Sequence, residues 1–395
     1  MNAPHPYSAQ DPPARAVHAP TIARLSHAVA RALRQATFGA GILALSAAAA
    51  SAWSGSDEAI ILQSPVIAST VPANGDLNPY GIAFVPGGVP PWSTLKAGDV
   101  VVSNFNGKAN LQGTGTTIVK LVPGAGNTPV TFFQGSNLGL TTALAVLRSG
   151  FVLVGNLPTT DGTTNTLMPP GSLLVINPQG RLIATLASKT LLDGPWDLTV
   201  IDHGRRVTAF VSNVLNGTVS RIELKIDDDG VAMLSNSLVI ASGYTFRTDP
   251  AALVVGPTGL AYDRDRDVLY VASTGDNAVF AIPNAASTSR TGGVGRMIYS
   301  DSVHLHGPLA LALAPNGHLF TANGDAVNPD PQQPSEIVEF TVDGQFISQM
   351  QVDSVSGSAF GLAFGRGSRG QSEFAAVDDN TNSATIWTLR PQDSH

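Results

Sequence analysis

The chain of 395 residues contains no cysteine, which excludes disulfide bonds, thiolate catalysis and cysteine-based metal sites. Charged residues are also few, at 13%, and acidic residues outnumber basic ones by 29 to 22. A protein with this balance is not expected to bind nucleic acid or anionic lipid through bulk charge. We therefore expect a small molecule, a cation or a protein as the partner, and no nucleic acid.

The sequence also lacks an apolar run long enough to span a membrane. Residues 36–50 are apolar but rich in alanine, and they fall short of the roughly 20 strongly apolar residues that a span needs. Arginines precede this run and Ala50-Ser51-Ala52 ends it, the pattern of a secretory signal peptide with its cleavage site. We expect residues 1–52 to be a signal peptide with a long basic segment and the mature protein to be periplasmic or secreted. An uncleaved membrane anchor is the alternative; after cleavage no stable membrane insertion is expected.

Glycine (40 residues) and proline (27 residues) are abundant, with short apolar segments between them. The stretch 256–284 predicts three short strands joined by two tight turns. Its first strand contains Gly259-Leu-Ala261, and related phrases recur along the chain. The six aligned segments are 80–84, 142–146, 196–200, 258–262, 309–313 and 360–364.

Each of these phrases is followed by a turn, a second valine-rich strand, a third strand and usually a fourth. Six units of four antiparallel strands, at a period of roughly 50–60 residues, predict an all-β fold, a six-bladed β-propeller over residues 74–390. A β-sandwich is the alternative, but it does not predict one strand-turn-strand phrase six times. The last copy lacks a fourth strand. We expect a strand at 59–68, within a linker of residues 53–73, to complete it and close the ring, leaving 391–395 as a tail.

The clearest copy is Gly259-Leu-Ala-Tyr-Asp263 followed by Val268-Leu-Tyr-Val-Ala-Ser-Thr-Gly-Asp-Asn277. It resembles the repeat of NHL-repeat propellers, and Val211–Ile222 is a second match. The array is also distantly similar to the propellers of the SMP-30/gluconolactonase group. That resemblance implies a metal enzyme with a glutamate at the start of the first blade and Asn/Asp ligands around the axis. The corresponding segment here, Asn78-Pro-Tyr-Gly81, contains no glutamate.

Polar residues end the second strands, on the face where the first strands of a propeller begin. We predict that they form a ring at the mouth of the axis: Asn104, Asn156, Asn213, Ser273, Asn323 and Asp378. Their oxygen atoms suit sugar-like hydroxyls or a hard cation, so Ca²⁺ or another divalent cation is the candidate cofactor. The candidate metal ligands are Asn104, Asn213, Asn323 and Asp378. The alternative is that these side chains hold turns by bonding to nearby backbone.

Aromatic residues share one register on the same face, namely Tyr80, Trp196 and Phe360. We predict that they line an apolar pocket beside the polar ring, with Asp197 and Asp325 adding charge at the mouth. Packing between blades is the alternative. His304 and His306 would face one side of a strand and suggest a transition-metal site, although no third ligand is evident.

The leading interpretation is an exported, monomeric propeller that binds a ligand or protein through its axial face without catalysis. The alternative is a hydrolase or lactonase with a metal on the polar ring. No serine-hydrolase Gly-x-Ser-x-Gly or zinc-protease His-Glu-x-x-His motif occurs in the chain.

Overall fold

The computed structural model of the protein describes residues 58–390, apart from residues 125, 137, 228–229, 325–331, 333, 335 and 356. The expected signal peptide and the C-terminal tail lie outside the described residues, so their assignment stays a prediction. No helix within the described part is long and apolar enough to span a membrane.

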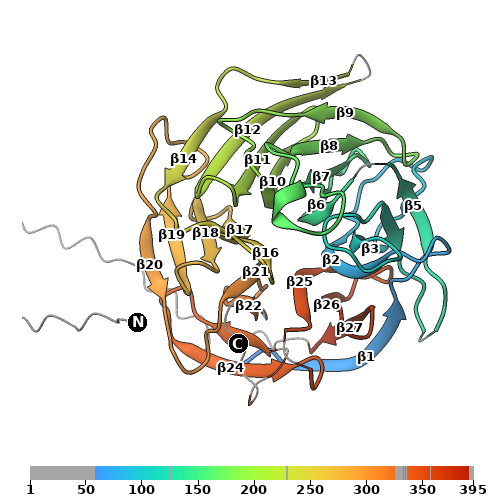
Figure 1. Ribbon diagram of the computed structural model, residues 1–395. Coiled ribbons are helices and arrows are strands. Elements are labelled where there is room, and N and C mark those ends of the chain that lie inside the picture. The colour runs from blue at the N-terminus through green and yellow to red at the C-terminus, as the bar shows by residue number, and fades with distance from the viewer. Residues whose placement is uncertain are drawn as a thin grey trace, which may run out of the picture. The chain divides into compact units, whose positions relative to one another are not determined.

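Six antiparallel sheets surround one axis, each with its first strand innermost (Figure 1). From the axis outward, the first blade consists of β2 (Leu77–Phe84), β3 (Val100–Asn106), β4 (Thr117–Lys120) and β5 (Val130–Gln134), and the second of β6 (Leu140–Val146), β7 (Val152–Asn156), β8 (Ser172–Ile176) and β9 (Leu182–Leu186). The third consists of β10 (Pro195–His203), β11 (Arg206–Asn213) and β12 (Thr218–Asp227), with β13 (Gly230–Met233) and β14 (Leu238–Ser242) outermost. The fourth blade consists of β17 (Pro257–Asp263), β18 (Val268–Ser273), β19 (Ala278–Pro283) and β20 (Arg296–Tyr299), and the fifth of β21 (Pro308–Leu313), β22 (Leu319–Asn323), β23 (Glu336–Phe340) and β24 (Phe346–Gln351). The sixth consists of β25 (Ala359–Arg366), β26 (Ser372–Asp378), β27 (Ser383–Leu389) and β1 (Leu62–Ser69). The predicted six-bladed propeller is confirmed.

The third blade departs from four strands. Its third strand, β12, has ten residues, and two short strands share its outer edge. β13 pairs with Leu224–Asp227, and β14 pairs with Thr218–Arg221. The third blade therefore has five strands, and the four-strand pattern of the sequence repeat does not describe it.

The sixth blade joins the two ends of the described chain. β1 pairs antiparallel with β27 from Leu62 opposite Leu389 to Ser69 opposite Ser383, with a bulge between Gln63 and Val66. β1 is thus the outer strand of the last blade, as expected for the unpartnered strand in the sequence. The pairing covers an edge of β27 that would otherwise be exposed.

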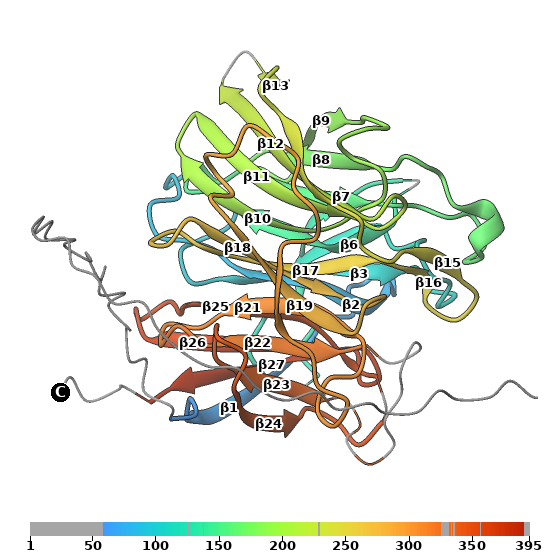
Figure 2. The ribbon, with the colours of Figure 1, turned by 90° about the vertical axis from the view of Figure 1, so that its left-hand side faces the viewer.

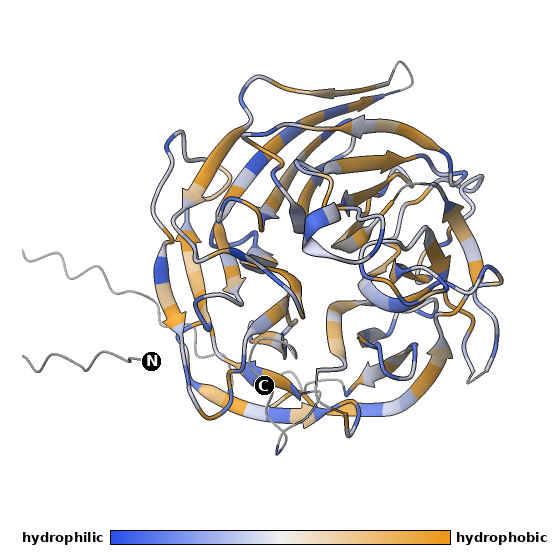
Figure 3. Ribbon diagram, in the orientation of Figure 1, coloured by the Kyte–Doolittle hydropathy of each residue, from blue (hydrophilic) through white to orange (hydrophobic). Residues whose placement is uncertain are grey.

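Small residues in the inner strands allow neighbouring blades to approach closely at the axis. A Cβ atom added to Gly259 would lie 2.4 Å from the amide nitrogen of Leu311, and one added to Gly361 would lie 2.1 Å from the carbonyl oxygen of Tyr80. The second strands are buried on both faces, so β3 and β7 begin with apolar runs, at residues 100–102 and 152–154, that show no alternation. Figure 3 shows this hydrophobic character along the strands.

The core consists of hydrophobic clusters between successive blades. One cluster, for example, joins Val101 and Ile118 of the first blade to Leu144 and Val154 of the second. Similar clusters join each later pair of neighbours. Because each blade buries both faces against its neighbours, the stability of one blade depends on the whole ring.

Candidate functional site

The face on which the inner strands begin carries a cap over the axis. A hairpin of β15 (Arg247–Asp249) and β16 (Leu253–Val255) projects from this face, as does the loop that contains the 3₁₀ helix η1 (Thr164–Thr166) (Figure 2). The side-chain amide nitrogen Nε2 of Gln112 donates a 2.8 Å hydrogen bond to the carbonyl oxygen of Ala251 in the hairpin turn. The hairpin is therefore held from the first blade as well as from its own stem.

Leu253 fixes the hairpin to the axis at a conformational cost. Its φ of 64° lies in the left-handed region, which a branched side chain rarely adopts. Its side chain is 1% exposed and packs, with Val254, in the hydrophobic cluster at the axial mouth. Burial of this side chain offsets the backbone strain, which is of a kind that clusters at functional sites.

Four aromatic rings pack against one another beneath the cap. The rings of Tyr80 and Phe360 stack with centroids 4.4 Å apart, and Tyr80 meets the edge of Trp196 at 5.7 Å. Phe105 lies 5.0 Å from Tyr80 and 5.6 Å from Trp196. The predicted register of Tyr80, Trp196 and Phe360 therefore brings the three side chains together, and all of them are buried. Phe105, at the end of β3, is a fourth member that the sequence alignment did not single out.

A hollow of about 100 Å³ lies between this aromatic cluster and the cap. Tyr80, Phe105 and Phe360 line it, whereas Trp196 does not. The remaining lining residues come from the hairpin and from loops of several blades: Asn78, Gln112, Ala251, Ala252, Val254, Thr274, Leu309, Gly324 and Asp379. The hollow thus has an aromatic floor and a partly polar rim.

Asn78, which lines this hollow, carries an unsatisfied polar atom. Its φ is 58°, and its backbone amide donates a 2.7 Å hydrogen bond to Asn382 Oδ1. Its own Oδ1 atom is buried and has no hydrogen-bond partner among the described residues. A buried amide oxygen without a partner loses its hydration without compensation, so a ligand that donates a hydrogen bond there would be favoured.

The asparagines of the predicted ring bond mainly within their own blades. Asn213 is the fullest example: its Oδ1 accepts from the Asp193 amide, and its Nδ2 donates to the carbonyl oxygen of Leu191 and to the hydroxyls of Thr218 and Ser220. Asn156 accepts from Gly139 N and donates to Ser172 Oγ, and Asn323 accepts from His306 N and donates to His304 O and Glu336 Oε2. Each side chain connects the loop before the inner strand, the end of the second strand and the start of the third. A ligand on these atoms would have to compete with those bonds.

Asn104 and Asp378 differ from the other ring members. Asn104 Nδ2 donates to Thr70 O and Thr117 Oγ1, but its Oδ1 is buried without a partner in the described structure. Asp378 accepts hydrogen bonds from the amide and the hydroxyl of Thr381, and burial raises the pKa of its carboxyl group above the ordinary value. In the fourth blade, Ser273 instead donates to Asp276 Oδ2 at 2.7 Å.

Asp197 lies deeper along the axis than expected. It lines the axial cavity formed by the inner strands and is not among the residues around the hollow. The structure thus places Asp197 on the wall of the axial cavity, whereas the sequence predicted it at the mouth beside Trp196. Successive residues of a strand point to opposite sides, so Trp196 can pack in the aromatic cluster while Asp197 faces elsewhere. Asp325 lies outside the described residues.

The histidine pair does not lie on a strand. His304 and His306 belong to the turn before β21. His304 Nδ1 is 2.7 Å from Asp301 Oδ2, its ring stacks on Phe346, and His306 Nε2 is 3.1 Å from the carbonyl oxygen of Val303. The part of the chain that the structure describes contains no group of three or more His, Asp or Glu side chains placed to hold a metal ion.

The sequence offered little signal for the cap. Residues 245–256 have no counterpart in the other five copies, and their role depends on where the preceding blade places them. The third and fourth copies are 62 residues apart, but the first and second copies are separated by the same number of residues, so the spacing did not single out an insertion at the axis.

The chain is therefore a capped six-bladed β-propeller with an aromatic cluster at its axial mouth. No protein-family model matches the sequence, and no curated protein matches it. Among solved structures, a gluconolactonase from Xanthomonas campestris is 13% identical with a TM-score of 0.49, over 84% of this chain and 97% of that one. The calcium-binding protein regucalcin from Agrobacterium tumefaciens is 14% identical with a TM-score of 0.49, over 82% and 96%. A chain of a nidogen/laminin complex is 11% identical with a TM-score of 0.41, over 81% and 91%.

These neighbours include propellers of the SMP-30/gluconolactonase group, the resemblance noted in the sequence. Similarities of this size concern the fold alone, so the function of this chain has to be argued from its own residues.

Proposed function

We propose that the protein is an exported binding module that takes a small aromatic group, free or as part of a larger partner, in the hollow under its cap, without catalysis. The observation that carries this proposal is the pairing of an aromatic floor with the unsatisfied Oδ1 of Asn78 in one hollow. Apolar walls with a few fixed polar groups are the usual composition of a ligand site. The ligand would stack on Tyr80 or Phe360 and donate a hydrogen bond to Asn78.

Phenol is a suitable first probe because it combines one aromatic ring with one hydroxyl donor. We expect ligand-detected NMR to show saturable binding with a Kd on the order of 1 mM, since the hollow holds few ligand atoms. Ala252→Leu should fill the hollow and weaken binding at least about tenfold. As a matched control, Ala286→Leu places the same side chain far from the cap and should leave phenol binding unchanged. The absence of saturable binding, or equal binding by the Ala252→Leu variant, would contradict the proposal.

The alternative is a metal-dependent lactonase, which the resemblance to the SMP-30 group implies. Two groups of the polar ring at the axial mouth favour this activity. They are the unpartnered Oδ1 atom of Asn104 and the carboxyl group of Asp378, whose pKa is raised by burial. Hydrolysis of gluconolactone in the presence of Ca²⁺ or Zn²⁺, abolished by chelator and by Asp378→Ala, would establish this activity and overturn the non-catalytic proposal. Phenol binding and lactone hydrolysis are measured independently, so the binding proposal and the lactonase proposal can each fail without the other.

Export is proposed from the signal-peptide pattern of residues 1–52. We expect the mature protein in the periplasm or the medium of a bacterial expression host, with an N-terminus at Trp53. N-terminal sequencing of the purified mature chain measures this directly. Replacing Ala50 and Ala52 with bulky residues should block cleavage, whereas the same change at Ala47 should not. A mature chain that still begins at residue 1 in the wild type would be inconsistent with export by this route.

A further inference from the structure

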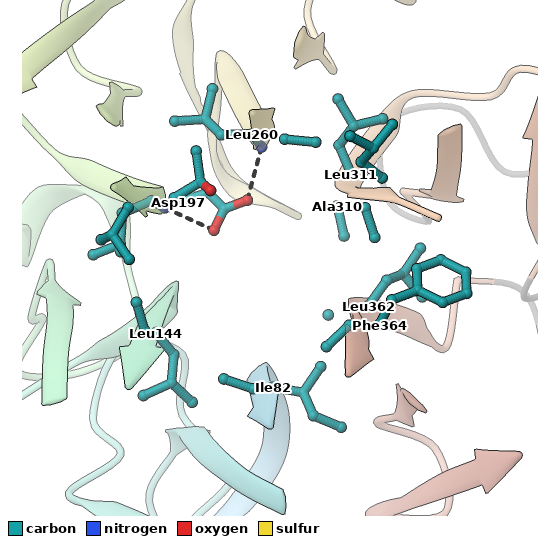
Figure 4. A pocket seen from close by; sticks show the side chains of 18 of the residues that line it. Ile82, Leu144, Asp197, Leu260, Ala310, Leu311, Leu362 and Phe364 are labelled. Atoms are coloured by element: carbon teal, nitrogen blue, oxygen red, sulfur yellow. Dashed lines mark hydrogen bonds between the residues drawn. The ribbon is translucent and has the colours of Figure 1, made fainter. Parts of the chain in front are cut away.

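The inner strands enclose an axial cavity of about 330 Å³ that is separate from the hollow under the cap. Its lining consists of residues from the middle and the C-terminal part of β2, β6, β10, β17, β21 and β25. The side chains are aliphatic or small in most of these positions, with Asp197 as the carboxyl group among the described lining residues (Figure 4). The wall also contains backbone, because each inner strand is paired on one side only and leaves its other edge toward the axis.

Asp197 differs in kind from the residues at the equivalent position of the other five inner strands. The equivalent residues of the other five blades are small: Gly81, Ala143, Gly259, Ala310 and Gly361. Alanine or glycine is thus sufficient for folding at this position, and packing alone does not call for a carboxyl group. A polar substitution that breaks a local rule is a reason to look for a function.

The carboxylate of Asp197 is held by two backbone amides from adjacent blades. Oδ1 accepts a 2.7 Å hydrogen bond from Leu198 N, and Oδ2 accepts a 2.9 Å bond from Leu260 N (Figure 4). Both bonds favour the ionised form of the carboxyl group. Each oxygen keeps a further lone pair, so the group is oriented as an anion without a cationic partner.

No positive side chain compensates this charge within the described lining of the cavity. The lining residues from the other five inner strands carry no lysine, arginine or histidine. The other titratable lining residue is Tyr262, whose hydroxyl donates to Asp267 Oδ1 at 3.0 Å. A buried anion without a counter-ion is costly, so either a proton or a bound cation must neutralise Asp197.

Backbone carbonyl groups supply further oxygen atoms at the same depth. The amides of Leu198 and Leu260 point toward Asp197, and the N–H and C=O of one residue in an antiparallel strand lie on the same edge. The carbonyl oxygens of these two residues therefore also face the axis. A carboxylate together with backbone carbonyls is a donor set for hard cations such as Ca²⁺ or the alkali-metal ions.

We propose that the axial cavity is a cation site in which Asp197 and inner-strand carbonyl oxygens bind a hard cation. This site is distinct from the ring of asparagines at the mouth, and it does not depend on what binds under the cap. Its role is structural: the cation joins the third and fourth blades at the axis, where Asp197 already bridges them.

The test is a thermal melt at pH 8 after treatment with chelator and exchange into tetramethylammonium chloride. CaCl₂, MgCl₂, NaCl and KCl are then added separately at equal ionic strength. A site with one carboxylate binds Ca²⁺ weakly, with a Kd on the order of 10⁻³ M, so about 10 mM is needed. We expect at least one of the four salts to raise the Tm by about 2–4 °C.

Asp197→Ala is the decisive variant, because alanine stands at this register in two other blades. It should fold and lose the cation-dependent rise in Tm. Asp343→Asn, which changes an exposed carboxyl group in the turn between β23 and β24, should retain the rise. A wild type that responds to none of the four cations overturns the proposal, and so does an Asp197→Ala variant that keeps the full response.

The pH dependence of stability gives a second measurement. Burial raises the pKa of Asp197 to about 8 when no cation is present. Between the ordinary aspartate pKa of about 4 and this value, the folded protein holds a proton that the unfolded chain does not, so stability falls as pH rises through that window. A bound cation favours the carboxylate and should reduce this loss in the wild type. An unchanged loss at saturating cation would mean that a proton neutralises Asp197, and it would overturn the proposal.

Discussion

Glu339→Ala is expected to lower the free energy of unfolding by about 3–5 kcal/mol. Glu339 lies in β23 and is 2% exposed. Its Oε1 atom is 2.7 Å from His318 Nδ1, and its carboxylate also accepts bonds from the Ile60 amide and from Ser348 Oγ. Truncation would remove the carboxylate from the buried imidazole of His318, which would keep only its 3.0 Å contact with Asn316 Nδ2 among the described residues, and from the half-buried amide of Ile60. It would also release the segment that leads into β1.

Chemical denaturation of single and double variants measures this effect. Glu373→Ala, which removes a less buried glutamate from β26, should cost less than about 1 kcal/mol. Because His318 and Glu339 interact directly, the double variant His318→Ala/Glu339→Ala should lose less than the sum of the two single variants. Additive losses would show that the two side chains do not stabilise the fold as a pair.

Removal of the closing strand is expected to have the second large effect. A chain that begins at Asn74 lacks β1, which pairs with β27 over most of its length. It also loses Ala68, which is fully buried in the mouth cluster, and the carbonyl oxygen of Thr70 that accepts from Asn104 Nδ2. We expect the Tm to fall by roughly 10 °C or more, on the basis of about 3–5 kcal/mol of lost burial and pairing. The exposed edge of β27 should also promote aggregation.

The matched comparison is a chain that begins at Glu58, which keeps β1 and the Ile60–Glu339 contact. It should melt like the mature protein, as measured by calorimetry and light scattering. Equal Tm values for the chains beginning at Glu58 and at Asn74 would contradict the idea that β1 stabilises the ring.

The polar residues at the ends of the second strands were located from the sequence, but the sequence did not decide whether they bind a ligand or stabilise their own blades. Asn156, Asn213 and Asn323 are the last residues of their second strands, as predicted, whereas Asn104 lies two residues before the end of β3. Side-chain amides at strand ends can bind ligands or bond to neighbouring backbone. The bonds of Asn213 to the amide of Asp193 and to the carbonyl oxygen of Leu191 serve the second purpose. Asn156 and Asn323 likewise bond to backbone of their own blades, so at these three positions asparagine is part of the construction of the blade.

The sequence by itself determined the number of blades and the order of their strands, because these follow from local apolar periodicity and turn residues repeated six times. It also indicated that β1 needs a distant partner. The tertiary structure alone decided that a hairpin covers the axis and that Tyr80, Phe105, Trp196 and Phe360 pack together. It likewise decided that Asp197 faces the axial cavity. These contacts join residues from different blades, and their distances depend on how the ring closes, which no local pattern specifies.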